Sequence, residues 1–251
     1  MDERLYQILS DLNAEAPKVR AAFNDLFDPA LGFKEDSLML FDFWKALPYQ
    51  QCVHPKDREV LAKHSGIFEL GIPPGHVSGR LKTAPVVACY LNPGFEEADR
   101  VYFSRETERR LLFEQINGES DFPLWFERWR KWFLQRVRFG QMTDAQLAST
   151  VAIFNVCAYA SKNANQLKPS IVKNLPSSKI ARRYLHEVLI PQAQRRERFV
   201  VIARGCWAWQ VDRSIESDNI RFAPNPTGGH FGPEIRDVIS KWLESRSTAE
   251  T

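Results

Sequence analysis

The spacing of apolar residues divides the chain into two parts. In the first part, apolar residues recur every three or four positions, a period typical of amphipathic helices. This pattern predicts helices over residues 2–12, 16–27 and 37–47. A stretch rich in glycine and proline, residues 66–79, then ends the pattern and predicts a long loop. We therefore expect a helical N-terminal extension over residues 1–79 that packs on a core domain.

The second part contains four short apolar runs, whose β-branched and aromatic residues are typical of buried strands. The four runs are residues 85–89, 151–157, 199–203 and 220–223. Helical patterns separate the first three runs, at residues 107–116, 123–138 and 178–195. Strands that alternate with helices predict a parallel sheet with helices on both faces and ligands at the carboxyl ends of its strands. The expected α/β domain spans residues 80–245, and residues 246–251 are expected to form a disordered tail.

The composition is typical of a globular chain with a large core. With 251 residues, of which 44% are hydrophobic, one large domain with an extension is expected. No apolar stretch approaches the roughly 18 residues of a membrane span. The start of the sequence has neither the basic residues nor the apolar run of a secretory signal. We expect a cytoplasmic protein with no membrane partner.

The spacing of cysteine and histidine excludes the simplest metal sites. The four cysteines lie far apart with no C-x-x-C pair, and the five histidines show no H-E-x-x-H pattern. Walker and G-x-G-x-x-G phosphate loops are absent from the sequence too. We therefore expect no metal and no cofactor.

The net charge of +3 is mild, but many basic residues are clustered in two stripes that alternate with apolar or aromatic residues. The first stripe consists of Arg128, Arg130, Lys131, Arg136 and Arg138. The second stripe consists of Lys179, Arg182, Arg183, Arg195, Arg196 and Arg198. Each stripe is either a phosphate-binding surface or the solvated face of an amphipathic helix, and the pattern alone leaves both open.

Two short loops of the same type carry the clearest chemical signal. The sequence Y-L-N-P-G-F occupies residues 90–95, after the first predicted strand, and P-N-P-T-G-G occupies residues 224–229, after the last. Proline fixes φ and removes a backbone donor, whereas glycine lets the backbone approach a ligand closely. Because the carboxyl ends of parallel strands share one edge, we expect the two loops to form two halves of one pocket.

A polar residue, Asn155, interrupts the apolar run of the second predicted strand. An unpaired buried polar group costs about 1–3 kcal/mol, so this amide must find partners. It is either bonded within the protein or faces a ligand. An amide offers one acceptor and two donors, which match the oxygen and N–H edge of a pyrimidine.

This ordered set of motifs resembles the uracil-DNA glycosylase superfamily, and within it the mismatch-specific uracil and thymine branch. The motifs of that branch look like G-I-N-P-G and N-P-S-G; here L-N-P-G ends at Gly94 and N-P-T-G begins at Asn225. The resemblance covers residues 82–242. It implies a three-layer α/β/α sandwich whose four-stranded parallel sheet has the order 2-1-3-4.

The resemblance also implies roles for the first motif and for the polar strand residue. Asn92 would orient the water that attacks the sugar carbon, and Asn155 would hold the edge of the base. Leu91 and Gly94 would line the base pocket. Strict uracil enzymes have a bulky tyrosine at the position of Gly94, so a wider pocket would follow here.

The second motif would hold the DNA. By resemblance, the residues in contact with DNA would be Asn225, Pro226, Thr227, Gly228, Gly229, His230 and Phe231. The family's wedge leucine is missing after this motif, so Phe231 would take its place, and His230 would contact a phosphate or a base. Phe103, or Tyr102 beside it, falls where the family places the ring that stacks on the flipped base.

The segment between the first two predicted strands departs from the family pattern. It is long, residues 96–150, and begins with the acidic pair Glu96 and Glu97. Residues 123–133 within it are unusually aromatic. Most of these rings are expected to pack their helix on the body of the domain, and the alternative is that one of them stacks on a base.

The resemblance implies a monofunctional DNA glycosylase, with DNA as its partner, that hydrolyses the N-glycosidic bond of a flipped modified or mismatched base and favours a uracil-like pyrimidine. The reaction needs fixed hydrogen-bond donors more than a pair of carboxylates. The alternative is a non-catalytic nucleotide or nucleic-acid binding protein on the same fold, with the helical extension contacting a protein partner. A hydrolase that uses His230 would lack a nucleophile, because no G-x-S-x-G motif is present.

Overall fold

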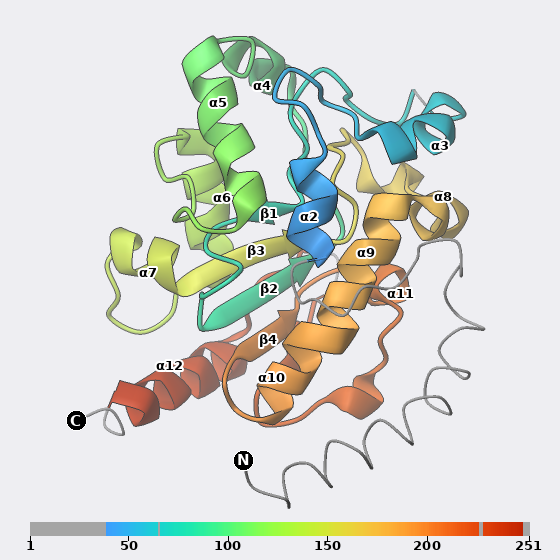
Figure 1. Ribbon diagram of the computed structural model, residues 1–251. Coiled ribbons are helices and arrows are strands. Elements are labelled where there is room, and N and C mark those ends of the chain that lie inside the picture. Colours follow the sequence, from blue (N-terminus) through green and yellow to red (C-terminus); the bar gives the residue numbers. More distant parts are fainter. Residues whose placement is uncertain (1–38, 65, 226–227, 248–251) are drawn as a thin grey trace, which may run out of the picture. The chain divides into compact units, whose positions relative to one another are not determined.

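The structure is a computed structural model of the chain (Figure 1). The part of the chain that it describes consists of residues 39–64, 66–225 and 228–247. These residues belong to one structural unit, Ser37–Thr251.

Several predictions fall outside the described residues. These are the helices expected over residues 2–12 and 16–27, the loop residues Pro226 and Thr227, and residues 248–251 of the expected tail. Contact between a protein partner and the N-terminal extension therefore stays a prediction. The first two residues of the expected tail, Arg246 and Ser247, are the last residues of a helix.

A five-stranded, mostly parallel sheet forms the centre of this unit, in the order β1-β3-β2-β4-β5. The parallel strands are β2 (Val86–Tyr90), β3 (Val151–Asn155), β4 (Phe199–Ile202) and β5 (Ile220–Phe222). The fifth strand, β1 (Val77–Ser78), pairs antiparallel with β3 at the edge of the sheet. The predicted α/β class with a parallel sheet is confirmed. The expectation of only four strands is wrong, because the short strand β1 ends the stretch that was predicted to be a loop.

The strands are apolar along their whole length because both faces of the sheet are covered. Successive side chains of a strand point to opposite faces. Val87 and Cys89 accordingly pack in one core, and Val86 and Ala88 pack in the other. A continuous apolar run therefore has the same cause here as in other parallel sheets.

Eleven helices are described in residues 39–64, 66–225 and 228–247. They are α2 (Met39–Lys45), α3 (Arg58–Ala62), α4 (Glu97–Tyr102), α5 (Glu106–Glu114), α6 (Glu127–Val137), α7 (Asp144–Thr150), α8 (Pro169–Asn174), α9 (Pro176–Tyr184), α10 (Ile190–Gln194), α11 (Cys206–Trp209) and α12 (Pro233–Ser247). A π-helical segment, Leu185–Leu189, joins α9 to α10. Short 3-10 turns lie at Pro55–Asp57, Gln115–Asn117, Ala164–Gln166 and Arg213–Ile215. None of the described helices is both long enough and apolar enough to cross a membrane.

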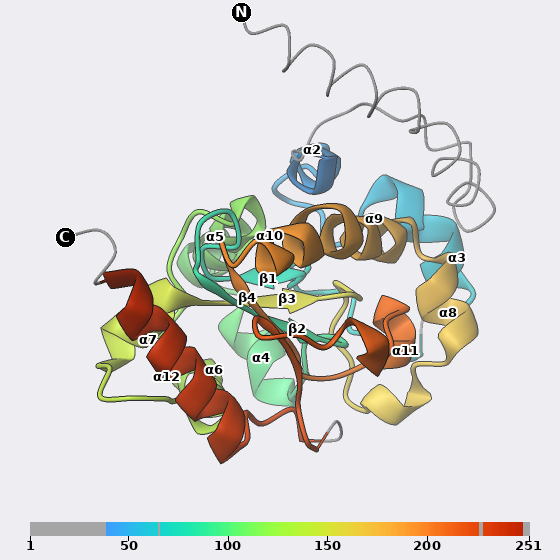
Figure 2. The same ribbon diagram turned by 90° about the horizontal axis from the view of Figure 1, so that it is seen from below.

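Helices cover both faces of the sheet (Figure 2). One core is shared with α2, α9 and α11, through residues such as Trp44, Tyr184 and Trp209. The other core is shared with α6, α7 and α12, through residues such as Phe133 and Ile239. Both α2 and β1 lie within residues 1–79, where the extension was predicted, and both contribute to the first of these cores.

Local sequence signals explain where several helices begin. A capping box starts α7: the Thr143 hydroxyl accepts a hydrogen bond from the Gln146 N–H, and the Gln146 side chain accepts one from the Thr143 N–H. Proline at the first position starts α8 and α9, because its missing N–H is not needed there. The predicted helix over 123–138 begins only at Glu127, since residues 123–126 form a turn.

A histidine, His76, is buried directly before β1. Among the described residues neither ring nitrogen of His76 has a partner, and the ring stacks on Trp44 with centroids 4.3 Å apart. Burial lowers the pKa of His76 well below its ordinary value of 6.5. The folded protein therefore keeps this ring neutral where the unfolded chain takes up a proton.

We expect stability to fall as the pH drops below about 6.5, because the unfolded state then binds a proton that folded His76 does not. The contribution is at most about 1.4 kcal/mol per pH unit, between the unfolded pKa and the lowered folded one. Urea unfolding of wild type and His76→Phe isolates this residue, since the other titrating groups are common to both. As the pH falls from roughly 7 to 5, the free energy of unfolding of wild type should decrease relative to that of the variant. A difference that stays constant with pH would contradict the prediction.

Candidate functional site

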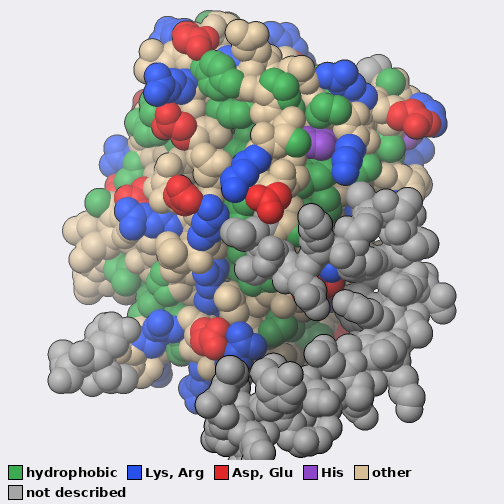
Figure 3. Space-filling model, viewed as in Figure 1, with side chains coloured by type: hydrophobic (Ala, Val, Ile, Leu, Met, Phe, Trp, Pro, Cys, Tyr) green, Lys and Arg blue, Asp and Glu red, His purple; other side chains and the backbone are tan. Residues whose placement is uncertain are grey.

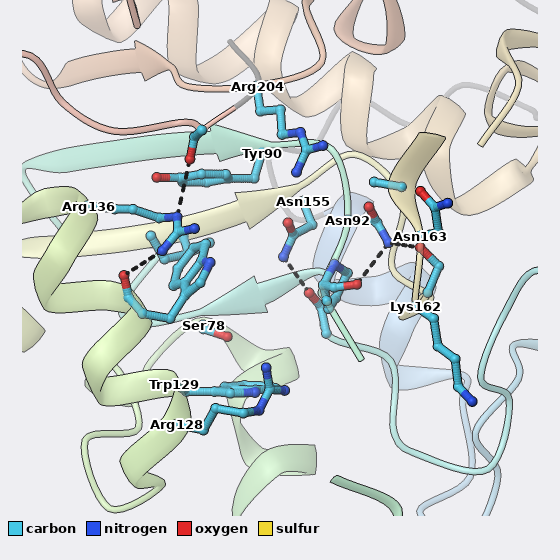
Figure 4. A pocket seen from close by; sticks show the side chains of 18 of the residues that line it. Ser78, Tyr90, Asn92, Arg128, Trp129, Arg136, Asn155, Lys162, Asn163 and Arg204 are labelled. Atoms are coloured by element: carbon cyan, nitrogen blue, oxygen red, sulfur yellow. Dashed lines mark hydrogen bonds between the residues drawn. The ribbon is translucent and has the colours of Figure 1, made fainter. Parts of the chain in front are cut away.

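A cavity of about 350 Å³ opens at the carboxyl ends of the parallel strands (Figure 4). Asn92, Pro93 and Gly94 of the first Asn-Pro loop line it, and so does Gly228 of the second. The end of β3 contributes Asn155. The structure therefore brings together residues from both loops and from the end of β3, which neighbours β2 in the sheet, as expected for one shared pocket.

Asn92 holds the first loop against the segment that follows β3. Its Nδ2 donates to the Ser161 Oγ at 2.9 Å and to the Pro93 carbonyl at 2.8 Å, with the Tyr159 carbonyl at 3.4 Å. Its Oδ1 accepts no hydrogen bond from any described residue. Because the side chain lines the cavity, this oxygen is an acceptor that a water molecule or a ligand can use.

Asn155 combines the two alternatives that its sequence position left open. The residue is 5% exposed, and its Nδ2 donates to the Gly75 carbonyl at 2.8 Å. Its backbone N–H donates to the His76 carbonyl at 2.8 Å, so the stretch rich in glycine and proline fixes the end of β3. The side chain also lines the cavity. Its carbonyl oxygen and one remaining N–H are therefore available to a ligand.

Tyr90 joins the end of β2 to the second Asn-Pro loop. Its hydroxyl donates to the Gly229 carbonyl at 2.5 Å, and burial raises the pKa of this hydroxyl. Gly229 has a φ of 63°, and a Cβ there would lie 2.6 Å from the Tyr90 Cε1. Only glycine fits this position, because a side chain would clash with the ring and would strain the backbone.

Aromatic rings form another wall of the cavity. Trp129 and Trp132 of α6 line it together with Phe122. Trp132 packs on Tyr90 with ring centroids 5.0 Å apart, and Trp129 packs on Phe103 at 5.7 Å. The sequence pattern assigned most rings of this helix to packing, and these two rings both pack and line the cavity.

Two cations that line the cavity are neutralised by the acidic residues near the first loop. Arg128 donates to both carboxylate oxygens of Asp99 and also pairs with Glu96 at 3.4 Å. Lys162 pairs with Glu97, and this hydrogen bond lowers the pKa of the Glu97 carboxyl. The acidic pair that departs from the family pattern thus forms ion pairs at the edge of the site, and neither Glu96 nor Glu97 lines the cavity.

The two remaining cations of the cavity, Arg136 and Arg204, have no carboxylate partner in the part of the chain that the structure describes. No described Asp or Glu lines the cavity either. The site is therefore electropositive, which suits an anionic ligand.

The two basic stripes differ in whether they reach the cavity. Of the first stripe, Arg128 and Arg136 line the cavity, whereas Arg130 and Arg138 pair with Asp144 outside it. On the face seen in Figure 3, basic side chains lie beside acidic ones rather than in one block.

The second stripe does not reach the cavity. Arg182 is buried and donates to the carbonyls of Val172 and Ala208, and Arg198 is buried and donates to the carbonyls of Leu81 and Lys82. These guanidinium groups satisfy backbone acceptors inside the fold. Arg182 and Arg198 are therefore structural residues, whereas Arg195 and Arg196 are exposed, and phosphate binding by these two stays a prediction.

Three residues predicted to contact the base or the DNA are buried elsewhere. Phe103 is 1% exposed and packs in a separate cluster with Phe95 and Leu112. Leu91 is buried against Gly205 on the α11 side of the sheet. Phe231 is 1% exposed in the core beside α12, so it does not project as a wedge. None of the three lines the cavity.

The remaining predicted residues of the second loop lie beside the cavity. Asn225 closes its own turn, because its Oδ1 accepts from the Gly228 N–H at 3.2 Å and its carbonyl accepts from the Gly229 N–H at 3.0 Å. His230 is exposed, with its Nδ1 3.3 Å from the Gln135 carbonyl. Both are at the surface next to Gly228, outside the lining of the cavity.

Sequence reasoning missed Arg204, Ser161 and Asn163, which all line the cavity. The position of Arg204 was predictable, because it follows the third predicted strand at the carboxyl edge of the sheet. Ser161 and Asn163 lie in a loop without any motif. No three His, Cys, Asp or Glu residues in the described ranges lie together where they could hold a metal ion.

Comparisons with known proteins add no family to this picture. No protein-family model, no curated protein and no solved structure matches the chain. The fold and the side chains of the cavity are therefore the basis for a functional proposal.

Proposed function

We propose that the protein is a monofunctional DNA glycosylase that hydrolyses the N-glycosidic bond of a flipped modified or mismatched base, with a uracil-like pyrimidine favoured. One observation carries this proposal. Asn92 and Asn155 follow or end adjacent strands and line one cavity. That cavity is lined by cations and by no described Asp or Glu. Such a cavity suits a polyanionic substrate and an anionic leaving base.

The strand order supports a fold like that of the uracil-DNA glycosylases. The four parallel strands lie in the order β3-β2-β4-β5, which are the second, first, third and fourth runs of the sequence. The two Asn-Pro motifs follow β2 and β5, the first and the last of these strands. A shared fold does not carry a reaction, so the chemistry of the cavity has to support it separately.

The two asparagines supply the chemistry that this hydrolysis needs. Bond cleavage passes through an oxocarbenium-like sugar and a base that leaves with negative charge. The free N–H of Asn155 can donate to that base, and a donor that is already held in position lowers the barrier electrostatically. The Asn92 oxygen can hold a water molecule in line with the sugar carbon, which replaces a bimolecular encounter by a positioned one. An amide cannot deprotonate water, so we expect a slower enzyme than one with an aspartate at this position.

In this proposal the base stacks on the tryptophans of α6 rather than on Phe103. Phe103 lies behind Trp129, and its own ring does not reach the cavity. Trp129 and Trp132 present aromatic surface to the cavity from the side of α6. Base–aromatic stacking contributes about 1–3 kcal/mol per base and tolerates different bases, which fits a pocket for an altered base.

The second candidate is a protein that binds a nucleotide or nucleic acid without cleaving it. The Nδ2 of Asn92 is fully engaged in loop contacts, as a purely structural asparagine would be. In this case the cations and rings of the cavity provide affinity and the reaction does not occur.

A panel of oligonucleotides distinguishes the two functions. Single-stranded and duplex oligonucleotides, each with one uracil, one thymine opposite guanine or one 5-substituted pyrimidine, are incubated with the purified protein and then treated with alkali to break abasic sites. Strand breaks at one or more of the altered bases are the expected result. Binding without any break would contradict the glycosylase and favour the binding protein.

Asn155→Ala should lower the rate of base release by about 100-fold, because it removes a donor to the leaving base. Asn219→Ala is the matched control. Asn219 is also buried and also donates through Nδ2 to one backbone carbonyl, that of Arg198 at 2.9 Å, but it lies outside the cavity. Both variants lose one buried hydrogen bond, and only Asn155→Ala should lose activity. Equal losses in single-turnover assays would show that the Asn155 effect is structural.

A further inference from the structure

Two arginines lie beside Tyr90 on one wall of the cavity, from elements that are far apart in sequence (Figure 4). Arg136 belongs to α6, and Arg204 follows β4. The two like charges raise each other's electrostatic energy, and burial together with the charge of Arg204 lowers the pKa of Arg136. An anion between or beside them would remove this repulsion.

Arg136 is held in position before any ligand binds. Its Nε donates to the Gly228 carbonyl at 3.2 Å, and one Nη donates to the Trp132 carbonyl at 3.3 Å. Its guanidinium also lies over the Trp132 ring, 4.8 Å from the centroid. The other Nη makes no hydrogen bond to a described residue. The side chain is thus fixed by backbone acceptors and keeps donors for the cavity.

Arg204 is positioned through its backbone and has its whole guanidinium available. Its N–H donates to the Cys89 carbonyl at 3.1 Å, which fixes the residue at the end of the sheet. Within residues 39–64, 66–225 and 228–247, its side chain has neither an ion pair nor a hydrogen bond. Arg128 and Lys162, the other two cations of the cavity, both pair with carboxylates. The uncompensated charge is therefore concentrated at Arg136 and Arg204.

We propose that Arg136 and Arg204 together bind one phosphate group of the substrate. Guanidinium groups present parallel N–H donors that match phosphate oxygens, and they stay charged when partly buried. Both arginines line the same cavity as Asn92 and Asn155, and Arg136 donates to the Gly228 carbonyl, so the phosphate that they bind would be one attached to the nucleotide in this cavity. The inference rests on the proposed function for the nucleotide part of this ligand. The phosphate belongs either to a DNA strand or to a free nucleotide.

Binding measurements test the pair without requiring catalysis. The first three probes are a uracil oligonucleotide and two copies of it that carry a single neutral methylphosphonate, one on the 5′ side and the other on the 3′ side of the deoxyuridine. The other two probes are deoxyuridine and deoxyuridine 5′-monophosphate. Arg136→Gln and Arg204→Gln should each weaken oligonucleotide binding by about 10- to 100-fold, since each removes charge-assisted hydrogen bonds. One of the two methylphosphonates should weaken binding to wild type by a similar factor and should cost Arg204→Gln little more.

Arg138→Gln is the matched control, because this arginine lies directly after α6 and pairs with Asp144 outside the cavity. It should change the Kd by no more than about threefold, as expected of an exposed ion pair. Arg204→Gln keeps the proposal testable if Arg136→Gln fails to fold, because the Arg204 side chain has no hydrogen bond to a described residue.

The probes also separate the two sources of the phosphate. Tighter binding of the monophosphate than of deoxyuridine, lost in Arg204→Gln, indicates a terminal phosphate; an effect confined to the oligonucleotides indicates the strand backbone. Wild-type affinity in both arginine variants, or a full methylphosphonate penalty in Arg204→Gln, would overturn the proposal. Phosphate-dependent binding without base release would leave this inference standing and would remove the glycosylase proposal.

Discussion

Asn92→Ala is expected to reduce the rate of base release by about 100-fold or more while the Kd for DNA changes only a few-fold. The substitution removes the cavity oxygen that would hold the attacking water, and that water is needed only in the chemical step. The cationic wall and the rings, which would provide affinity, are left in place. Single-turnover rates on a uracil oligonucleotide, measured together with binding at equilibrium, separate the two effects.

Ser161→Ala controls for the structural part of the Asn92 side chain. Asn92 donates to the Ser161 hydroxyl at 2.9 Å, so this second variant loosens the first loop but keeps the asparagine oxygen. We expect Ser161→Ala to lose less than about tenfold in rate, in line with one neutral hydrogen bond. If both variants lose the same factor, Asn92 acts by holding its loop and the water-positioning role is wrong.

Trp209→Ala is expected to have the largest effect on stability, a decrease of about 3–5 kcal/mol in the free energy of unfolding. Trp209 is 0% exposed, its ring lies 5.0 Å from that of Phe154, and its Nε1 donates to the Tyr90 carbonyl at 3.1 Å. The substitution therefore leaves a cavity under the sheet and removes one of the two hydrogen bonds that the Tyr90 carbonyl accepts, the other coming from the Val156 N–H at 3.1 Å. Urea unfolding followed by circular dichroism measures the change.

Trp207 provides the control on the same short helix. Its side chain is 45% exposed, in contrast to that of Trp209 two residues later. Trp207→Ala should change the free energy of unfolding by less than about 0.5 kcal/mol, as is usual for a surface position. Comparable losses in the two variants would mean that α11, rather than the buried ring, determines the effect.

The sheet was predictable from the sequence because each parallel strand is buried on both faces. All four apolar runs contain strands, since a strand covered by helices has no polar side to interrupt the run. β1 was not predictable in the same way. Two residues are too few to show a period, and Val77 and Ser78 form a strand only because the edge of β3 accepts them.

The C-terminal helix and the π-helical segment were not predicted, for different reasons. The helix α12 has Ile235, Ile239 and Trp242 at helical spacing, and all three are buried, so the sequence does contain the apolar period of this helix. The π-helical segment Leu185–Leu189 could not be recognised, because it continues the periodic pattern between α9 and α10.

The candidate site was predictable where motifs follow strands, and not where tertiary packing decides. Asn92, Gly94 and Asn155 reach the cavity because the strand ends carry them there. Phe103 and Trp129 are both aromatic residues of the same insertion, and only the packing of α6 determines which ring faces the cavity. The stripes show the same limit: spacing identified clustered charge, but only the fold separates Arg136 in the cavity from Arg182 in the core.

The bond between Tyr90 and Gly229 limits how this pocket can be altered by loop exchange. The two residues are 139 positions apart, yet the ring of one fills the space above the other. A library that varies the second loop has to keep glycine at position 229, because any side chain there would displace Tyr90, the last residue before the first loop. Changes of specificity are therefore best sought at Trp129 of the insertion or at Asn163 in the loop after β3, where substitutions leave the contact between the two Asn-Pro loops intact.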